Sequence, residues 1–164
     1  MVVRQLAEKE GTNVEFAEFQ GLVDALLAEH ASKGYPPEIR ILDEVRADDA
    51  DIEAVETQLG ARLPEKYKQV LTTYGGGMFG FVDLLPVRSP KDGESDVLTE
   101  NTGEFAVAGF VQVAPVGSGD MWGFAVHDGV CAEAVSMWFH DTGEIQFESG
   151  DFLEFMATRG VRAR

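Results

Sequence analysis

The stretch of residues 52–81, IEAVETQLGARLPEKYKQVLTTYGGGMFGF, limits most strongly what this chain can fold into. Apolar residues recur at helical spacing from Ile52, and Gly60 follows where a left-handed helix cap is expected. Pro64 suits the first position of a second helix, which needs no backbone N–H. Three glycines at residues 75–77 end this helix, since glycine is a poor helix former and accepts positive φ. The sequence therefore predicts two short helices in succession, a sharp turn and then a strand.

This stretch opens a series of sequence motifs that continues along the chain. L-G-x-x-L-P-x-x-Y and the glycine run resemble the opening motif of the SUKH superfamily, in the branch named after the yeast Smi/Knr cell-wall regulators. The resemblance covers about residues 48–157. Its later parts are FVQVA at 110–114, GSGDMWGF at 117–124, HDTG at 140–143 and FLEF at 152–155.

This resemblance implies a fold and a role. The fold implied is α+β, with a mainly antiparallel sheet. Most bacterial members are thought to be immunity proteins, which bind and neutralise toxins delivered between competing cells. The alternative from the same superfamily is a regulatory scaffold of the Smi/Knr type.

The length of 164 residues suits a single domain, which we expect to span residues 1–164 with one core. The single cysteine, Cys131, excludes an internal disulfide. No apolar run approaches the ~18 residues of a membrane span, and the chain does not begin with the pattern of a secretion signal. We therefore expect a cytoplasmic protein that does not contact the membrane.

The charge is strongly negative and unevenly distributed. Twenty-nine acidic against thirteen basic residues give a formal net charge of −16, and residues 92–158 contain thirteen acidic residues but no lysine or arginine. Nucleic acid is thereby excluded as a partner, because its phosphates need cationic side chains. A protein with a basic face would be attracted. Taken alone, the charge is explained more simply by solubility, and the family resemblance is what favours a partner.

An amphipathic helix is predicted at residues 13–32, before the recognised region. Thr12 and Glu15 have capping-box spacing, and apolar residues then follow at helical intervals until Gly34. We expect this helix to pack on the core, because an exposed apolar stripe promotes aggregation; an interface with a partner is the alternative. Residues 38–47 suit either a strand or a helical turn.

After the glycines the sequence predicts one strand at 79–85, a polar loop at 89–103 and an antiparallel meander. Asp-Gly and Asp-Thr-Gly sequences between the later apolar runs are typical of hairpin turns. A short helix after Asp151 ends the pattern. The sum is an α+β fold, a mainly antiparallel sheet flanked by N-terminal helices and a short C-terminal helix. The later strands are expected at 105–116, 122–126, 135–139 and 145–147.

Residues with catalytic or metal-binding potential are scattered and match no established spacing. His127-Asp128 and His140-Asp141 each place a carboxylate beside an imidazole, but predicted turns explain both pairs. The acidic cluster at residues 48–51 suits a helix N-terminus better than a metal site. We therefore expect no enzyme activity, no cofactor and no metal.

The candidate contacts with a basic toxin are acidic side chains that we expect to be exposed, together with Trp122. If the toxin is a nuclease, these carboxylates would mimic phosphates. Asp120 and Trp122 have two interpretations: a binding hot spot, or a core tryptophan beside an aspartate that bonds its own turn, which we favour. The full set is Glu94, Asp96, Glu100, Glu104, Asp120, Trp122, Asp128, Asp141 and Glu144.

Overall fold

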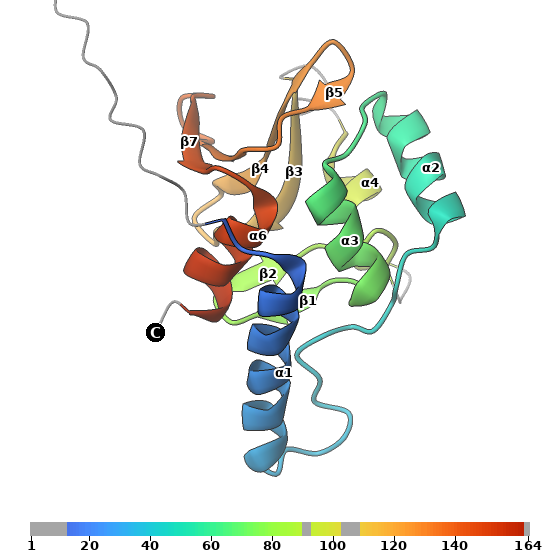
Figure 1. Cartoon of the computed structure of the whole chain (residues 1–164). Coiled ribbons are helices and arrows are strands. Elements are labelled where there is room, and N and C mark those ends of the chain that lie inside the picture. Colours follow the sequence, from blue (N-terminus) through green and yellow to red (C-terminus); the bar gives the residue numbers. More distant parts are fainter. Residues whose placement is uncertain (1–12, 90–92, 103–108, 163–164) are drawn as a thin grey trace, which may run out of the picture.

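The computed structural model describes residues 13–89, 93–102 and 109–162 of the chain. The main sheet occupies the upper part of Figure 1, helices α3 and α6 lie beneath it, and helix α1 runs away from it at the bottom. One hydrophobic cluster extends from Val14 to Ala157 and includes side chains from all these elements. The fold is α+β, as the sequence predicts.

The main sheet is antiparallel, with the strand order β3-β4-β6-β7, and β5 pairs with β4. Met121, at the start of β4, lies opposite Pro115 of β3 and Trp138 of β6. The turns at 116–120 and 139–144 therefore lie at the same end of the sheet, and the β4–β5 turn lies at the other. Four of the strands match predicted ones, and β5 is additional. The strands are β3 (Phe110–Pro115), β4 (Met121–His127), β5 (Val130–Cys131), β6 (Val135–Trp138) and β7 (Ile145–Ser149).

The single strand predicted at 79–85 is wrong. The structure has a separate hairpin of β1 (Gly77–Phe79) and β2 (Val82–Leu84). Gly80 makes the reversal possible, because it adopts φ +66° and lies where any Cβ would come within 2.3 Å of the carbonyl oxygen of Gly160. A distant part of the chain thus requires the glycine at this turn.

The helices follow the prediction with some corrections. Helix α1 (Phe16–Ser32) begins after residue 13 and lacks the predicted capping box, since its N-cap Glu15 makes no side-chain cap bond and Thr12 lies outside the described residues. Asp48 and Asp51 form a capping box for α2 (Asp49–Leu59), and Gly60 ends that helix with φ +65°. Pro64 is the N-cap of α3 (Glu65–Thr73) and not its first residue.

Two helical segments differ from expectation. The polar loop contains the short helix α4 (Val97–Glu100), which Asp96 caps by accepting a hydrogen bond from the Thr99 backbone N–H. The closing helix α6 (Phe152–Phe155) continues as a π-helix, η1 (Met156–Val161). In the part of the chain that the structure describes, no helix is long and apolar enough to cross a bilayer.

Helix α1 packs on the core, as expected. Phe19 and Val23 are fully buried, and the Phe19 ring lies 6.2 Å from the rings of both Phe79 and Tyr74. Arg162, just after η1, reaches back to Glu18 with a 2.5 Å ion pair. The N-terminal helix is therefore joined both to the β1–β2 hairpin and to the end of the chain.

Aromatic rings join the sheet to the helices at the centre. The ring of Tyr67 on α3 lies 5.3 Å from Phe124 on β4 and 5.0 Å from Phe152 on α6. Beside them, Trp122 packs edge-on against Phe155 at 5.1 Å. Such aromatic pairs each contribute about 0.5–1.5 kcal/mol beyond the area they bury.

The glycines at 75–77 do more than end α3. Residues 38–47 form neither a helix nor a full strand, but an extended segment with an isolated bridge from Leu42 to Gly77. A Cβ on Gly75, Gly76 or Gly77 would lie within 2.4–2.6 Å of a backbone carbonyl oxygen of this segment or of β2. The glycine run therefore lets three stretches of backbone pack directly together.

Gly76→Ala tests this packing at a glycine whose φ is not positive, so the effect comes from the contacts of the added Cβ. We expect it to lower the free energy of unfolding by about 1–3 kcal/mol, because backbone atoms of Leu84 and Pro86 must move. Gly21→Ala is the matched control: a Cβ there meets nothing within 4 Å, and we expect a gain of about 0.5–1 kcal/mol in the helix interior. Urea unfolding measures both, and equal effects would contradict the packing argument.

Candidate protein-binding surface

The predicted acidic contacts fall into two groups, one in the turns at one end of the main sheet and one elsewhere in the molecule. Asp120, Asp141 and Glu144 lie in or beside the turns at 116–120 and 139–144. Asp128 is in the β4–β5 turn at the other end. Glu94, Asp96 and Glu100 lie on the segment around α4, and Glu104 lies outside the described residues. No single surface includes the whole predicted set.

Asp120 joins the two turns of the first group. Its Oδ1 accepts the backbone N–H of His140 at 3.0 Å and faces His140 Nδ1 at 2.7 Å, while Oδ2 accepts the Ser118 hydroxyl at 3.0 Å. The other ring nitrogen, Nε2, lies 2.9 Å from Asp141 Oδ1. His140 is therefore held between two carboxylates from different turns.

This geometry favours the charged imidazole. The hydrogen bond with Asp120 raises the pKa of His140, and the charge of Asp141 adds to the effect. The hydrogen bond from His140 in turn lowers the pKa of Asp120. Since both ring nitrogens donate to carboxylates, neither is available as a base or a metal ligand. The group links two turns and has no catalytic geometry.

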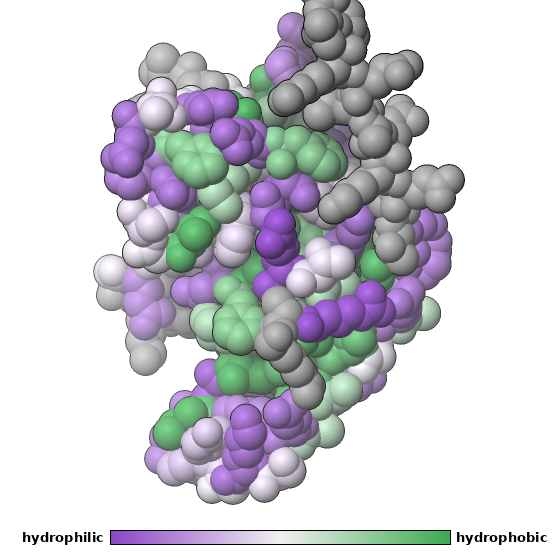
Figure 2. Space-filling model, turned by 90° about the vertical axis from the view of Figure 1, so that its left-hand side faces the viewer, coloured by the Kyte–Doolittle hydropathy of each residue, from purple (hydrophilic) through white to green (hydrophobic). Residues whose placement is uncertain are grey.

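An apolar centre lies beside this acidic group. Ile145 and Phe147 are two residues apart on β7, so their side chains project from the same face of the sheet, and they are 38% and 70% exposed. Among the described strands, β7 pairs only with β6, which leaves its other edge open. In Figure 2, which faces the β7 side, hydrophobic rings stand among hydrophilic side chains over the upper part of the molecule.

We call this combined area the hairpin surface. Its acidic residues are among the contacts predicted from the sequence, whereas Ile145 and Phe147 are not, because their exposure was not inferred from the short apolar run. The alternation in Ile-Gln-Phe-Glu-Ser was the available signal for a strand with one apolar face. The hairpin surface consists of Asp120, His140, Asp141, Glu144, Ile145 and Phe147.

The acidic residues of the second group stabilise the local structure of loops and turns. The Asp96 carboxylate accepts hydrogen bonds from the backbone N–H groups of Thr99 and Ser89, at 2.8 and 3.2 Å. Partial burial opposes ionisation, but these bonds and that of the Thr99 hydroxyl hold the pKa of Asp96 below its usual value. Asp128 adopts φ +51° to make its turn. These carboxylates shape loops on the far side from the hairpin surface.

Trp122 and Cys131 belong to the interior. Trp122 is only partly exposed and packs on the main core, and its buried indole N–H has no hydrogen-bond partner among the described residues. Burial raises the pKa of the Cys131 thiol to about 12, so it is not a nucleophile at neutral pH. Within the described ranges, no group of three or more histidine, cysteine or acidic residues is arranged to hold a metal.

We expect the stability that the Asp120–His140 pair contributes to depend on pH. Its contribution to stability is complete between about pH 4 and 6.5, and is lost as pH rises through the raised pKa of His140 or falls through the lowered pKa of Asp120. We expect Asp120→Asn to move the pKa of His140 back toward 6.5, and Asp141→Asn to move it less. An NMR titration of the His140 ring measures both shifts. An unchanged pKa in Asp120→Asn would contradict the assigned cause.

Comparison with known proteins agrees with the motifs and the fold. A SUKH family model described as SMI1-KNR4 cell-wall matches residues 49–156, which is more than half of the chain. The matched span runs from α2 to the start of η1 and excludes α1 and the extended segment that follows it. No curated protein gives a match. The chain therefore belongs to the SMI1-KNR4 family of the SUKH superfamily.

Proposed function

We propose that this protein is an immunity protein, which binds a cognate toxin domain in the cytoplasm and blocks it without catalysing a reaction. Membership of the SUKH superfamily supports the proposal, because this is the role attributed to most of its bacterial members. The formal charge of −16 favours a toxin with a basic face. A nuclease fits this description, and so does any other enzyme with a cationic substrate site.

The observation that carries the proposal is the combination of an apolar centre and an acidic rim on the hairpin surface. Phe147 is the most exposed large apolar side chain there, and Asp141 and Glu144 lie in the turn that leads into the same strand. Protein interfaces combine a desolvated apolar or aromatic centre with a polar rim in this way. The rim also has a kinetic use, because complementary charge raises association rates from ~10⁵–10⁶ to ~10⁸–10⁹ M⁻¹s⁻¹ at low salt.

A regulatory scaffold is the second candidate, because the description of the matching family model refers to the cell wall. The two roles differ in what happens when the protein is lost. An immunity protein is essential only where its toxin is present, whereas loss of a scaffold alters the wall or growth with no toxin involved.

Coexpression with candidate toxins tests the proposal directly. Each candidate is expressed alone and together with this protein, and survival is measured. We expect one toxin, with a basic face, to kill alone and to be harmless in the coexpressing cells, and the two proteins to copurify. Copurification with several wall or signalling proteins, and no protection against any toxin, would favour the scaffold.

Phe147→Ala tests the apolar centre. We expect it to weaken toxin binding by about tenfold or more, as for an aromatic hot spot. Phe81→Ala is a matched control, because Phe81 is 68% exposed against 70% for Phe147 and lies on the β1–β2 turn. Calorimetry gives both affinities. Equal losses of affinity in the two variants, or a loss only in Phe81→Ala, would show that the toxin binds elsewhere on the protein. The immunity proposal itself would stand, because it is tested separately by protection in the coexpression experiment.

Neutralising the rim tests the role of charge. We expect the double variant Asp141→Asn and Glu144→Gln to slow toxin association several-fold at low salt, and the difference to fade at about 0.5 M salt, where screening is strong. The control is Glu94→Gln with Glu100→Gln, which removes the same charge around α4, away from the turns at 116–120 and 139–144. Stopped-flow association rates compare the pairs. A larger effect of the control pair would move the binding site to the α4 side.

A further inference from the structure

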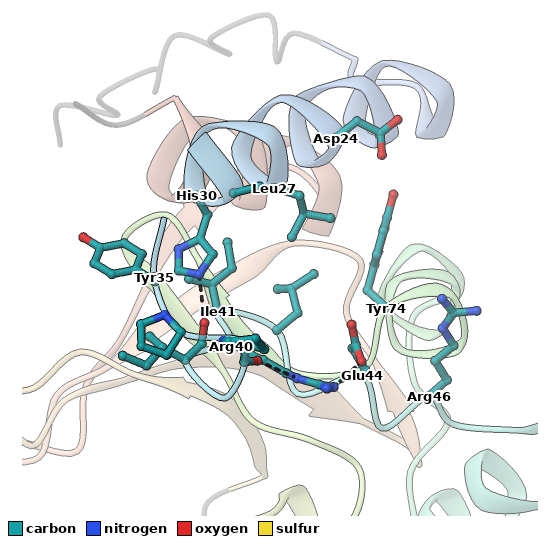
Figure 3. Close-up of a pocket in the computed structure, with 14 residues that line it drawn as sticks. Asp24, Leu27, His30, Tyr35, Arg40, Ile41, Glu44, Arg46 and Tyr74 are labelled. Carbon is teal, nitrogen blue, oxygen red and sulfur yellow. Dashed lines mark hydrogen bonds and ion pairs between the residues drawn. The ribbon is translucent and has the colours of Figure 1, made fainter. Parts of the chain in front are cut away.

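A cavity of about 550 Å³ lies between the end of α1 and the extended segment of residues 35–46 (Figure 3). Tyr74, at the end of α3, is the one lining residue that falls within the family match. The cavity lies at the bottom of the molecule in the view of Figure 1, far from the hairpin surface at the upper left. It is therefore separate from the surface to which the proposed function refers.

The walls of this cavity are held in place by hydrogen bonds within the chain. On the far wall, the Asp43 backbone N–H donates to the Gly76 carbonyl at 3.1 Å, and Met78 N–H donates to the Ile41 carbonyl at 2.6 Å. Across the rim, His30 Nε2–H donates to the Ile39 carbonyl at 2.9 Å. The space is thus preformed, and its volume is typical of sites for small molecules.

Most of the lining is apolar and comes from two sides. Leu27 and Ala31 on α1 face Ile41 and Leu42 on the extended segment, with the Tyr35 ring at the rim 5.0 Å from the ring of His30. Apolar walls that stand apart in water favour an occupant with an apolar body, because its entry releases their hydration.

The charges gather at the end near Tyr74. In Figure 3 the carboxylate of Asp24 and the hydroxyl of Tyr74 point toward each other, and Arg46 lies beside the Tyr74 ring. Neither Asp24 nor Arg46 makes an ion pair with another described residue, whereas Arg40 and Glu44 pair at 2.5 Å at the cavity mouth. Burial raises the pKa of Tyr74, with further contributions of opposite sign from Asp24 and Arg46. One anion and one cation, neither of them in an ion pair with another described residue, therefore lie at the two ends of the Tyr74 side chain.

The backbone at the mouth of the cavity is strained at Glu44. It is one of two non-glycine residues with positive φ in the described chain, at +60°, a conformation that few non-glycine residues adopt. This conformation turns the chain between Ile41 and Arg46, both of which line the cavity. Strained backbone of this kind is frequent at binding sites.

We propose that the cavity binds a free α-amino acid with a large apolar or aromatic side chain. Its side chain lies between Leu27 and Ile41, its ammonium group faces Asp24, and its carboxylate faces Arg46, a geometry that guanidinium groups favour. A phosphate ligand is disfavoured by Asp24 and Glu44, and a purely cationic ligand by Arg46. A zwitterion with an apolar side chain is the ligand class that satisfies both charges and the walls.

Calorimetry on the full chain with phenylalanine, leucine and tryptophan tests the proposal, with lysine and aspartate as comparison ligands. We expect at least one apolar amino acid to bind, and lysine and aspartate to bind at least tenfold more weakly. Phenethylamine and 3-phenylpropionate lack one charge each, and we expect each to bind about fivefold or more weakly than phenylalanine. No binding of any amino acid at 10 mM, or equal binding of all three phenyl compounds, would overturn the proposal.

Variants locate the ligand within the cavity. We expect Asp24→Asn and Arg46→Gln each to weaken binding about fivefold, and Ala31→Trp to abolish it by filling the space. Ala28→Trp is the matched control, because Ala28 is exposed on the same helix and does not line the cavity. Circular dichroism checks that both tryptophan variants fold. Binding that survives in Ala31→Trp, or is lost equally in Ala28→Trp, would place the ligand elsewhere and reject this site.

Discussion

The direct contact between two stretches of backbone, the glycines 75–77 and the segment 41–45, is the constraint on which much of the structure depends. A side chain at Gly77 would meet the Ile41 carbonyl at 2.4 Å, so only glycine permits the contact. The contact fixes where β1 begins and holds the extended segment against the domain. It also builds the far wall of the cavity beneath α1. The glycine run therefore determines the start of β1, the position of the extended segment and one wall of the cavity.

The hairpin surface depends on a second long-range contact. Asp120 and His140 come from different hairpins, and their hydrogen bonds hold both turns in one position. Because the turns are already fixed, a partner that meets Asp141 and Phe147 does not have to order them, which lowers the entropy cost of association. Under the proposed function, the acidic charge would attract a basic partner, and the rigid apolar centre would then retain it.

Local patterns in the sequence predicted much of this fold. The helices from Asp49 and Glu65, the Gly60 cap and the antiparallel strands follow from spacing and turn residues, which act over a few positions. The β1–β2 hairpin was missed because Gly80 is required by Gly160, far away in the sequence. The exposure of Phe147 was missed for a related reason: an apolar strand residue faces water only where nothing packs on that face of the sheet, and what covers a face is a property of the whole fold.

The burial of Phe19 has a consequence for where the chain can be divided. Its ring fills the space between Tyr74 and Phe79, both of which belong to the region that the family match defines. A fragment that started at residue 49 would leave these rings facing water and would lose the ion pair of Arg162 with Glu18. Such a fragment would tend to self-associate through these exposed apolar rings. For this chain, the limits of the recognisable family and the limits of an autonomous folding unit are different boundaries.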